Sequence, residues 1–113
     1  MDAESIQDLF QDLGPVRIRR MFGGQGIYAG DRMFALEADG ELYLKVDDTS
    51  RPAFEAAGSR PFVFEANGRA TAMSYWLMPG EGLDDPAGAA RWGRLAIEAA
   101  GRAAAKPRAR RRA

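Results

Sequence analysis

The chain has 113 residues, of which 46% are hydrophobic, and it contains neither cysteine nor histidine. A chain of this length and composition can form one domain whose core needs no disulfide. The two missing residue types exclude disulfides, zinc fingers, His-dependent catalytic triads and most transition-metal sites. No loop has the carboxylate spacing of a calcium or magnesium site, so we expect neither a metal nor a cofactor.

Charge is distributed unevenly along the chain. The formal net charge is zero, but residues 1–100 carry 10 basic and 16 acidic residues, a net charge of −6. Six of the 16 basic residues fall in the last thirteen positions, which hold no acid: Arg102, Lys106, Arg108, Arg110, Arg111 and Arg112. An acidic body with a basic tail argues against binding of nucleic acid through the folded surface.

Residues 1–30 contain no basic segment followed by an apolar one, and no apolar run approaches the roughly 20 residues of a membrane span. We therefore expect a cytoplasmic protein without membrane contact.

The first element expected is a short amphipathic helix over residues 2–13, with Asp2 as its cap and Gly14-Pro15 as its end. Its apolar residues have the spacing of one helical stripe: Ile6, Leu9, Phe10 and Leu13.

Residues 16–46 are expected to form an antiparallel meander, the centre of the fold. Asp39-Gly40 predicts a type I′ turn between two apolar runs, and Gly30-Asp31 is expected to form the same turn one hairpin earlier. Period-two alternation predicts one core face, made by Phe22, Phe34, Leu36, Leu42 and Leu44. The opposite, wet face would carry Met33, Ala35, Glu37, Glu41, Tyr43 and Lys45.

A second helix is expected over residues 47–58, capped by Ser50 or Thr49. A hairpin then runs from Pro61 to about Met78, with an Asn67-Gly68 turn. Within the hairpin Phe62 and Phe64 share a face, as do Met73, Tyr75 and Leu77, while Tyr75 and Trp76 lie on opposite faces.

After a loop at residues 79–82, Asp85 before Pro86 predicts the start of a closing helix that frays after Gly101. Its buried stripe would be Trp92, Leu95, Ala96 and Ala99. These elements predict an α+β fold in which a mainly antiparallel sheet, a meander plus a hairpin, is flanked by three helices. The expected order is α-β(3-4)-α-β(2)-α, in one domain over residues 1–101. Residues 102–113 would form a disordered basic tail.

Several short motifs occur in a fixed order along the chain. Residues 20–24 read RMFGG, residues 42–45 read LYLK, and Tyr75 precedes a loop at Pro79. Together with Gly26, Tyr28, Met33-Phe34 and Pro61-Phe62, they give the chain a resemblance to the N-terminal domain of the TfoX/Sxy family, which are bacterial regulators of natural DNA competence. The resemblance implies a helix-flanked antiparallel fold of the kind seen in secretion chaperones. Full-length members carry a second, helical C-terminal domain, so this chain, ending in a basic tail, resembles the stand-alone members.

Two patterns that could suggest chemistry have simpler interpretations. Residues 24–29 fit the dinucleotide pattern G-x-G-x-x-A, but the helix that would receive the pyrophosphate is missing, so a glycine-shaped turn or bulge is expected. The carboxylates Glu37, Glu41, Asp47 and Asp48 are close in sequence, but their spacing indicates the wet face of a hairpin rather than paired-carboxylate catalysis.

We therefore expect a non-enzymatic regulatory or adaptor domain that acts through contact with a protein, for example in the transcription machinery, and whose binding surface could also support a homodimer. Arg20 interrupts an apolar strand face shared with Val16 and Ile18, so it either snorkels or pairs with a carboxylate. The candidate partner-binding residues are Arg20, Phe22, Gly23, Gly24, Tyr43 and Lys45.

The alternative is a direct, non-specific binder of nucleic acid. It would use Arg17, Arg19 and Arg20 together with the tail residues Lys106, Arg108, Arg110, Arg111 and Arg112. A small enzyme is the least favoured class, because the chain has no histidine or cysteine.

Overall fold

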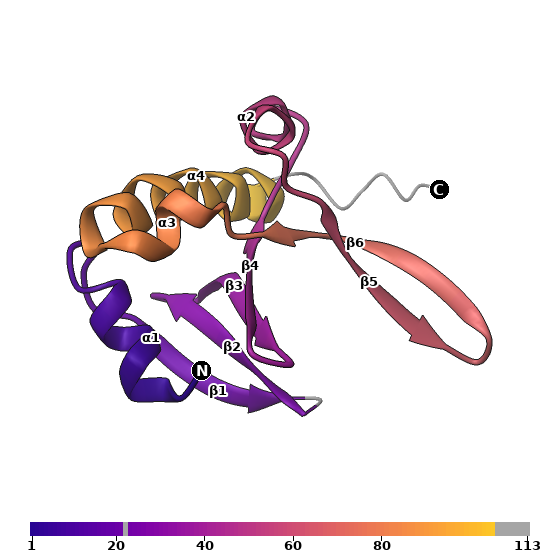
Figure 1. Ribbon diagram of the computed structural model, residues 1–113, viewed down its shortest axis with the longest axis horizontal. Helices are drawn as coiled ribbons and strands as arrows, with labels where there is room; N and C mark the ends of the chain where they lie inside the picture. Colours follow the sequence, from indigo (N-terminus) through magenta and orange to yellow (C-terminus); the bar gives the residue numbers. More distant parts are fainter. Residues whose placement is uncertain (22, 106–113) are drawn as a thin grey trace.

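The computed structural model describes residues 1–21 and 23–105; Phe22 and the tail residues from Lys106 onward lie outside the described residues. One six-stranded antiparallel sheet has the strand order β1-β2-β3-β4-β6-β5, with helices packed against it (Figure 1). This arrangement confirms the predicted α+β fold. The elements are α1 (Ala3–Leu9), β1 (Arg17–Met21), β2 (Gly24–Ala29), β3 (Arg32–Ala38), β4 (Glu41–Lys45), α2 (Arg51–Ala56), β5 (Pro61–Ala66), β6 (Arg69–Leu77), α3 (Gly80–Asp84) and α4 (Pro86–Ala105).

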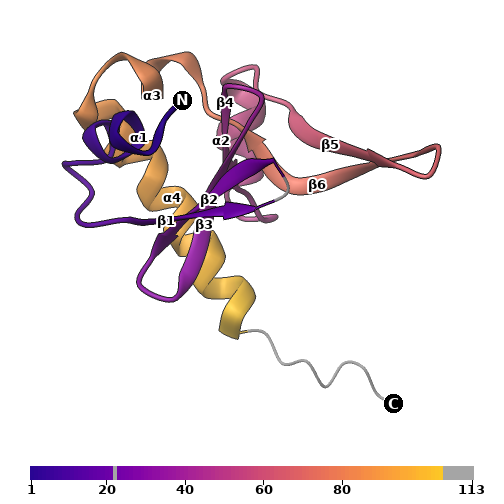
Figure 2. The ribbon, with the colours of Figure 1, turned by 90° about the horizontal axis from the view of Figure 1, so that it is seen from below.

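The helices gather on one face of the sheet, which we call the helix-covered face (Figures 1 and 2). The core lies between them and the strands, where Phe10 meets Phe34 edge-on at 5.3 Å between ring centroids. Phe54 of α2 meets Trp92 of α4 in the same way at 4.9 Å. The opposite face, which we call the helix-free face, is covered by none of the helices within the described residues.

A bulge in β3 changes the predicted core face of the meander. Ile27 pairs with Ala35 and Tyr28 pairs with Met33, so Phe34 is an extra residue in its strand. Phe34 and Ala35 are consequently both buried in the core. The prediction that Leu36 shares the core face with Phe34 is therefore wrong, because the extra residue moves Leu36 to the helix-free face, opposite Tyr43.

The same shift puts Glu37 on the helix-covered face, so its predicted position on a wet face is also wrong. Its side chain is only 8% exposed and accepts hydrogen bonds from Gln25 Nε2 at 3.0 Å and from the Gly40 amide at 2.8 Å. Burial raises the pKa of this carboxyl, but the two hydrogen bonds and the nearby N-terminal amine outweigh it and hold the pKa below its usual value. The sequence contains no local signal for this bulge.

Two of the three turns predicted from the sequence occur in the structure. Asp39 and Gly40 both have positive φ, as do Asn67 and Gly68, which confirms two of the predicted turns. At the third turn only Gly30 has positive φ, so Gly30-Asp31 is not the predicted type I′ pair.

Helix boundaries differ from the prediction at several ends. The Asp2 and Asp85 caps are confirmed, since their carboxylates accept hydrogen bonds from the amides of Ser5 at 2.9 Å and Gly88 at 2.8 Å. Helix α1 ends at Leu9, and the predicted loop at residues 79–82 contains the start of the short helix α3. Helix α4 continues to Ala105, four residues past the predicted fraying point at Gly101.

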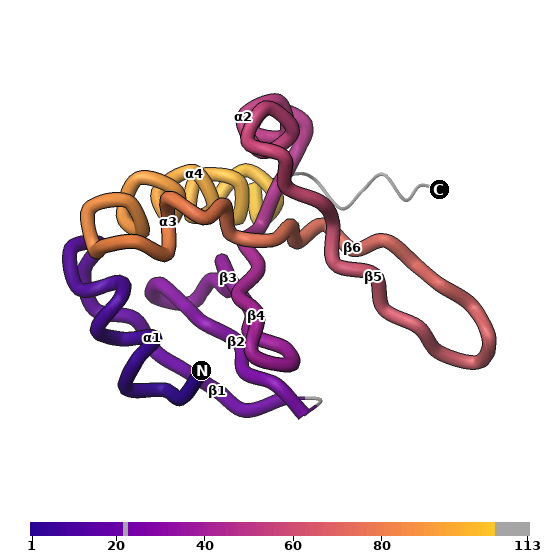
Figure 3. Tube along the Cα trace, viewed as in Figure 1, coloured from indigo at the N-terminus to yellow at the C-terminus, as the bar shows by residue number. Residues whose placement is uncertain are grey.

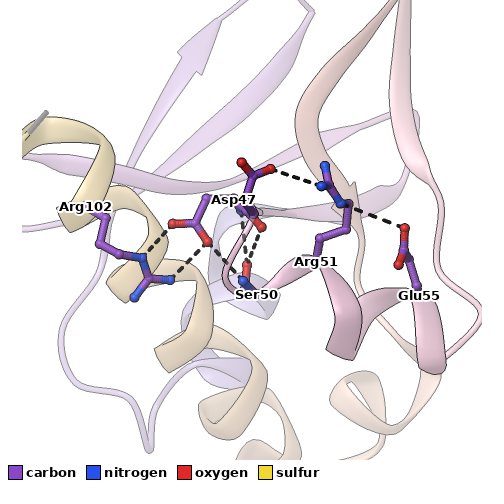
Figure 4. A network of polar contacts seen from close by, with 6 residues as sticks. Asp47, Ser50, Arg51, Glu55 and Arg102 are labelled. Carbon is purple, nitrogen blue, oxygen red and sulfur yellow. Dashed lines mark hydrogen bonds and ion pairs between the residues drawn. The ribbon is translucent and has the colours of Figure 1, made fainter.

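An ion pair holds the last turn of α4 against the β4–α2 loop (Figure 4). Arg102 donates to the two carboxylate oxygens of Asp47 at 2.6 and 3.0 Å, and the amide of Ser50 donates to the same carboxylate at 3.0 Å. Ser50 thus bonds Asp47 and makes no side-chain cap on α2, contrary to the prediction. The hydrogen bonds from Arg102 are the main reason that the pKa of Asp47 is far below its ordinary value.

The β5–β6 hairpin extends away from the rest of the molecule as an arm (Figure 3). Only the base of β6 joins the meander, through the pairs Tyr43–Leu77, Leu44–Trp76 and Lys45–Tyr75. As predicted, Tyr75 and Trp76 lie on opposite faces: Trp76 packs against the core, and Tyr75 lies on the helix-free face.

Candidate functional site

An apolar groove runs along the helix-free face, between the meander and the hairpin arm. Its side chains come from β1, β3, β5 and β6, and we define it by Met21, Met33, Leu36, Phe62, Phe64, Met73 and Tyr75. Phe64 is 48% exposed and Met73 is 38% exposed, large fractions for apolar side chains. The groove is therefore a contiguous apolar surface in contact with solvent.

Strand geometry explains how this groove forms. The β3 bulge puts Leu36 on the helix-free face together with Met33, and the alternation in the hairpin turns Phe62 and Phe64 the same way. Gly26 leaves room for two methionines, because a Cβ there would lie 2.8 Å from Met21 Cε and 2.9 Å from Met33 Sδ. The floor of the groove thus depends on a residue without a side chain.

A row of cations and tyrosines, which we call the basic row, crosses the same face beside the groove. The guanidinium carbons of Arg17 and Arg19 lie 5.2 and 5.9 Å from the ring centroid of Tyr28. Lys45 Nζ lies 5.3 Å from the ring centroid of Tyr75 and donates to Ser74 Oγ at 2.7 Å. These are cation–π distances, so the rings hold the cations at defined positions.

Partial burial shifts the pKa values of Lys45 and Tyr75. Burial lowers the pKa of Lys45, partly offset by the charge of Asp47. Burial raises the pKa of Tyr75 to about 12, with a smaller contribution from Tyr28. Tyr75 therefore remains a neutral phenol, whose hydroxyl donates to the Met33 carbonyl at 3.4 Å.

The structure places the predicted partner-binding residues on two different faces. Arg20 pairs with Gln25 and lines an open depression beside α1, on the helix-covered side. Tyr43 and Lys45 belong to the helix-free face, where the Tyr43 ring packs on Phe62 at 4.8 Å. Arg20 and Lys45 consequently do not meet in one patch. Arg20 is exposed and makes no salt bridge with another described residue.

The two glycines of the predicted site have clear structural roles. Gly23 has φ of +78°, which favours glycine, and a Cβ on Gly24 would collide with the carbonyl oxygen of Glu37 on the neighbouring strand. The dinucleotide-like glycines Gly24 and Gly26 both lie in β2 (Gly24–Ala29). The pattern is therefore part of a strand and not the start of a helix, as expected, but neither glycine forms the expected turn. A role of Gly23 and Gly24 in partner binding stays a prediction.

The family profile described as TfoX N-terminal domain matches residues 8–100 of the chain. The match runs from the end of α1 into α4 and includes the meander and the hairpin arm. The chain belongs to the TfoX N-terminal domain family. Among curated proteins, a sequence comparison finds no match.

The residues proposed for nucleic-acid binding are also divided in this TfoX N-terminal domain. Arg17 and Arg19 pair with Tyr28 and Gly26 on the helix-free face, whereas Arg20 lies on the other side of the strand. Lys106, Arg108, Arg110, Arg111 and Arg112 lie outside the described residues. The described part of the TfoX domain therefore does not combine the three arginines into one basic patch.

Within residues 1–21 and 23–105, no group of three or more acidic side chains is arranged to hold a metal ion. In the same part of the chain, no helix has the length and apolar character needed to cross a membrane.

Sequence reasoning missed the groove as a site of this TfoX domain, although it predicted some of the shared faces. The alternation that places Phe62 with Phe64, and Met73 with Tyr75, was visible in the hairpin. That these side chains lie opposite Met21, Met33 and Leu36 depends on the β3 bulge and on pairing of β4 with β6. Neither feature has a local sequence signal.

Proposed function

We propose that this TfoX N-terminal domain is a non-enzymatic adaptor with a competence-regulator-like role, and that it acts by binding another protein through its helix-free face. The observation that carries the proposal is the apolar groove, which no element in the described part of the chain covers. A contiguous exposed apolar surface on a small domain is typical of a protein-interaction site. The absence of histidine and cysteine from the sequence further favours binding over catalysis.

The hairpin arm supports the same proposal. A two-stranded hairpin is marginally stable in water unless further strands or a partner support it. Among the described residues, β5 pairs with β6 alone, and beyond its base β6 has no second neighbour in the sheet. Phe64 and Met73 lie on this part of the arm, so a partner seated in the groove would cover them and stabilise the arm.

Arg20 and Lys45 offer a matched test, because each is a single cation and the two lie on opposite faces. The immobilised domain would be used to capture proteins from an extract of the native host, with circular dichroism as the control for folding. Lys45→Ala should reduce recovery of the partner several-fold, because the basic row loses one cation, whereas Arg20→Ala should leave recovery unchanged. A partner that is lost with Arg20→Ala but retained with Lys45→Ala would place the binding surface on the helix-covered side and contradict the proposal.

The competence-regulator-like role has a separate test in the host. Deletion of the gene should lower the frequency of transformation by DNA, and the Lys45→Ala variant should restore it less well than the wild type. An unchanged frequency after deletion would separate this domain from competence control, while the binding test above would still stand on its own.

A further inference from the structure

We infer that the apolar groove binds a partner segment of a particular chemistry: a peptide with two or more apolar side chains flanked by carboxylates. This inference rests on the proposed function and specifies the partner. It follows from two features of the helix-free face, the apolar lining of the groove and the positive charge beside it.

The lining favours the apolar side chains of a peptide over a rigid small molecule. Three of the seven groove residues are Met21, Met33 and Met73, and three more are aromatic. Methionine side chains are flexible and polarisable, so they repack around differently shaped apolar groups. The groove encloses about 370 Å³, and its residues Phe64 and Met73 are exposed, so it can accept a few apolar side chains of a segment laid across it.

Charge determines what should flank those apolar side chains. None of Arg17, Arg19 and Lys45 forms a salt bridge with another described residue. This is notable because residues 1–100 contain 16 acids against 10 basic residues. Three cations of one face thus lie over Tyr28 and Tyr75 without a carboxylate of the described residues in salt-bridge contact. A carboxylate of the partner would complete these interactions.

At the Tyr43 end of the helix-free face the charges are mixed, and this difference indicates where the carboxylates of a bound peptide should lie. Burial raises the pKa of Tyr43, and the negative charges of Glu41 and Asp39 raise it further. The positive charge of Arg60 lowers it. The acidic residues of the partner should therefore lie toward the basic row, on the side of Tyr28 and Tyr75, and not toward Tyr43.

A second copy of the chain fits this face less well than a partner peptide. A two-fold dimer through the helix-free face would bring a second basic row into the interface, whereas a peptide with carboxylates would supply the opposite charge. A segment of a second copy could offer the chemistry of the inferred peptide at Leu83, which is 47% exposed and is followed by Asp84 and Asp85. However, α3 packs on α4 at the helix-covered side, so its docking in the groove of another copy would join chains head to tail.

Phe64 and Val63 provide a matched pair of variants for the test. They are neighbours in β5 with nearly equal exposure, 48% and 47%, and only Phe64 lines the groove. A phage-displayed library of random 16-residue peptides would be selected on the full chain, and the enriched peptides would be measured by fluorescence anisotropy. Phe64→Ser should weaken their binding about tenfold or more, and Met73→Ser should weaken it similarly. Val63→Ser should change it less than about twofold; circular dichroism verifies that each variant is folded.

The inference also predicts the composition of the peptides. Enriched peptides should contain apolar residues with Asp or Glu nearby, and their affinity should fall as salt rises or when Arg17 and Lys45 are both changed to Gln. It is overturned if no peptide is enriched, if the enriched peptides lack acidic residues, or if Phe64→Ser binds them as tightly as the wild type.

Two other outcomes would identify a different occupant. Self-association in sedimentation that is lost with Phe64→Ser would assign the groove to a second copy, and retention of a single-stranded oligonucleotide that depends on Tyr28 and Lys45 would assign the face to nucleic acid. A captured host protein that needs Lys45 but binds through a basic or purely polar segment would overturn this inference and leave the proposed function intact.

Discussion

At Gly24 the RMFGG motif of residues 20–24 has a steric explanation. A Cβ at this position would collide with the backbone carbonyl of Glu37 in β3, so an alanine must displace one strand from the other. We expect Gly24→Ala to lower the free energy of unfolding by about 1–3 kcal/mol, the range for overpacking a well-fitted site. Gly80→Ala is the control, since its Cβ would meet nothing within 4 Å and its φ is not positive. Equal stability of the two variants in urea unfolding would contradict the packing seen at Gly24.

Tyr75 gives a prediction about pH at the same scale. In the folded domain its pKa is raised to about 12, mainly by burial, whereas the ordinary value is 10.0. Between about pH 10 and about pH 12 the unfolded chain loses this proton and the folded chain keeps it, so the free energy of unfolding should fall as the pH rises. Ultraviolet titration of the phenols should show a group near pH 12 that is missing in Tyr75→Phe. Identical titration curves above pH 11 for the two proteins would contradict the burial of Tyr75.

At the scale of single elements, the β3 bulge decides which side chains are core. Phe34 is fully buried against Phe10, whereas Leu36, two residues later, is only partly buried on the helix-free face. We expect Phe34→Ala to cost about 3–5 kcal/mol and Leu36→Ala to cost roughly 1 kcal/mol. Thermal and urea unfolding of both variants measure this difference. Similar large losses would mean that the two side chains share one face and that β3 has no bulge.

At the scale of the whole molecule, the ion pair between Asp47 and Arg102 connects the end of α4 to the β4–α2 loop. Because the folded state lowers the pKa of Asp47, the stabilisation is fully present above the ordinary pKa near 4 and is lost as the pH falls below it. We expect Asp47→Asn to be less stable than the wild type at pH 7, with a difference that shrinks on acidification. Arg51→Ala is the control, since Arg51 pairs with Asp48 and Glu55, which are both exposed. A difference that is constant with pH would contradict the role of the Asp47 charge.

The nucleic-acid alternative also belongs to this scale, because it depends on how charge is distributed over the chain. Residues 1–105 carry 11 basic and 16 acidic residues, while positions 106–113 add five basic residues and no acid. Any retention on duplex DNA should therefore depend on residues 106–113 and should weaken steeply as salt rises. The full chain and a chain ending at Ala105 would be compared on immobilised duplex at low and moderate salt. Equal retention of the two would assign DNA binding to the folded domain.

Much of the fold was predictable, because local signals decide it. Asp2 and Asp85 cap helices, Asp39-Gly40 and Asn67-Gly68 form turns, and alternating residues define strands. The prediction failed where no local signal exists: the bulge that exposes Leu36, the burial of Glu37 and the extension of α4 to Ala105. The extended part of α4 contains Arg102, which bonds Asp47, a residue 55 positions away.

The candidate site was less predictable than the fold for the same reason. Arg20 belongs to the RMFGG motif and Lys45 to the LYLK motif, but strand pleating puts the two side chains on opposite faces of the sheet. The groove combines side chains from β1 and β3 with others from β5 and β6, so it exists only when β4 pairs with β6. No spacing along the chain contains that information.

The sequence by itself determined the α+β class, two of the three predicted turns, most of the core and the family, since each depends on neighbouring residues or on a linear motif. Tertiary structure alone decided which face of the sheet stays uncovered and which apolar side chains and cations meet there. The physical reason is that a sheet face is assembled from strands distant in the chain, and one extra residue in β3 is enough to change which side chains that face presents.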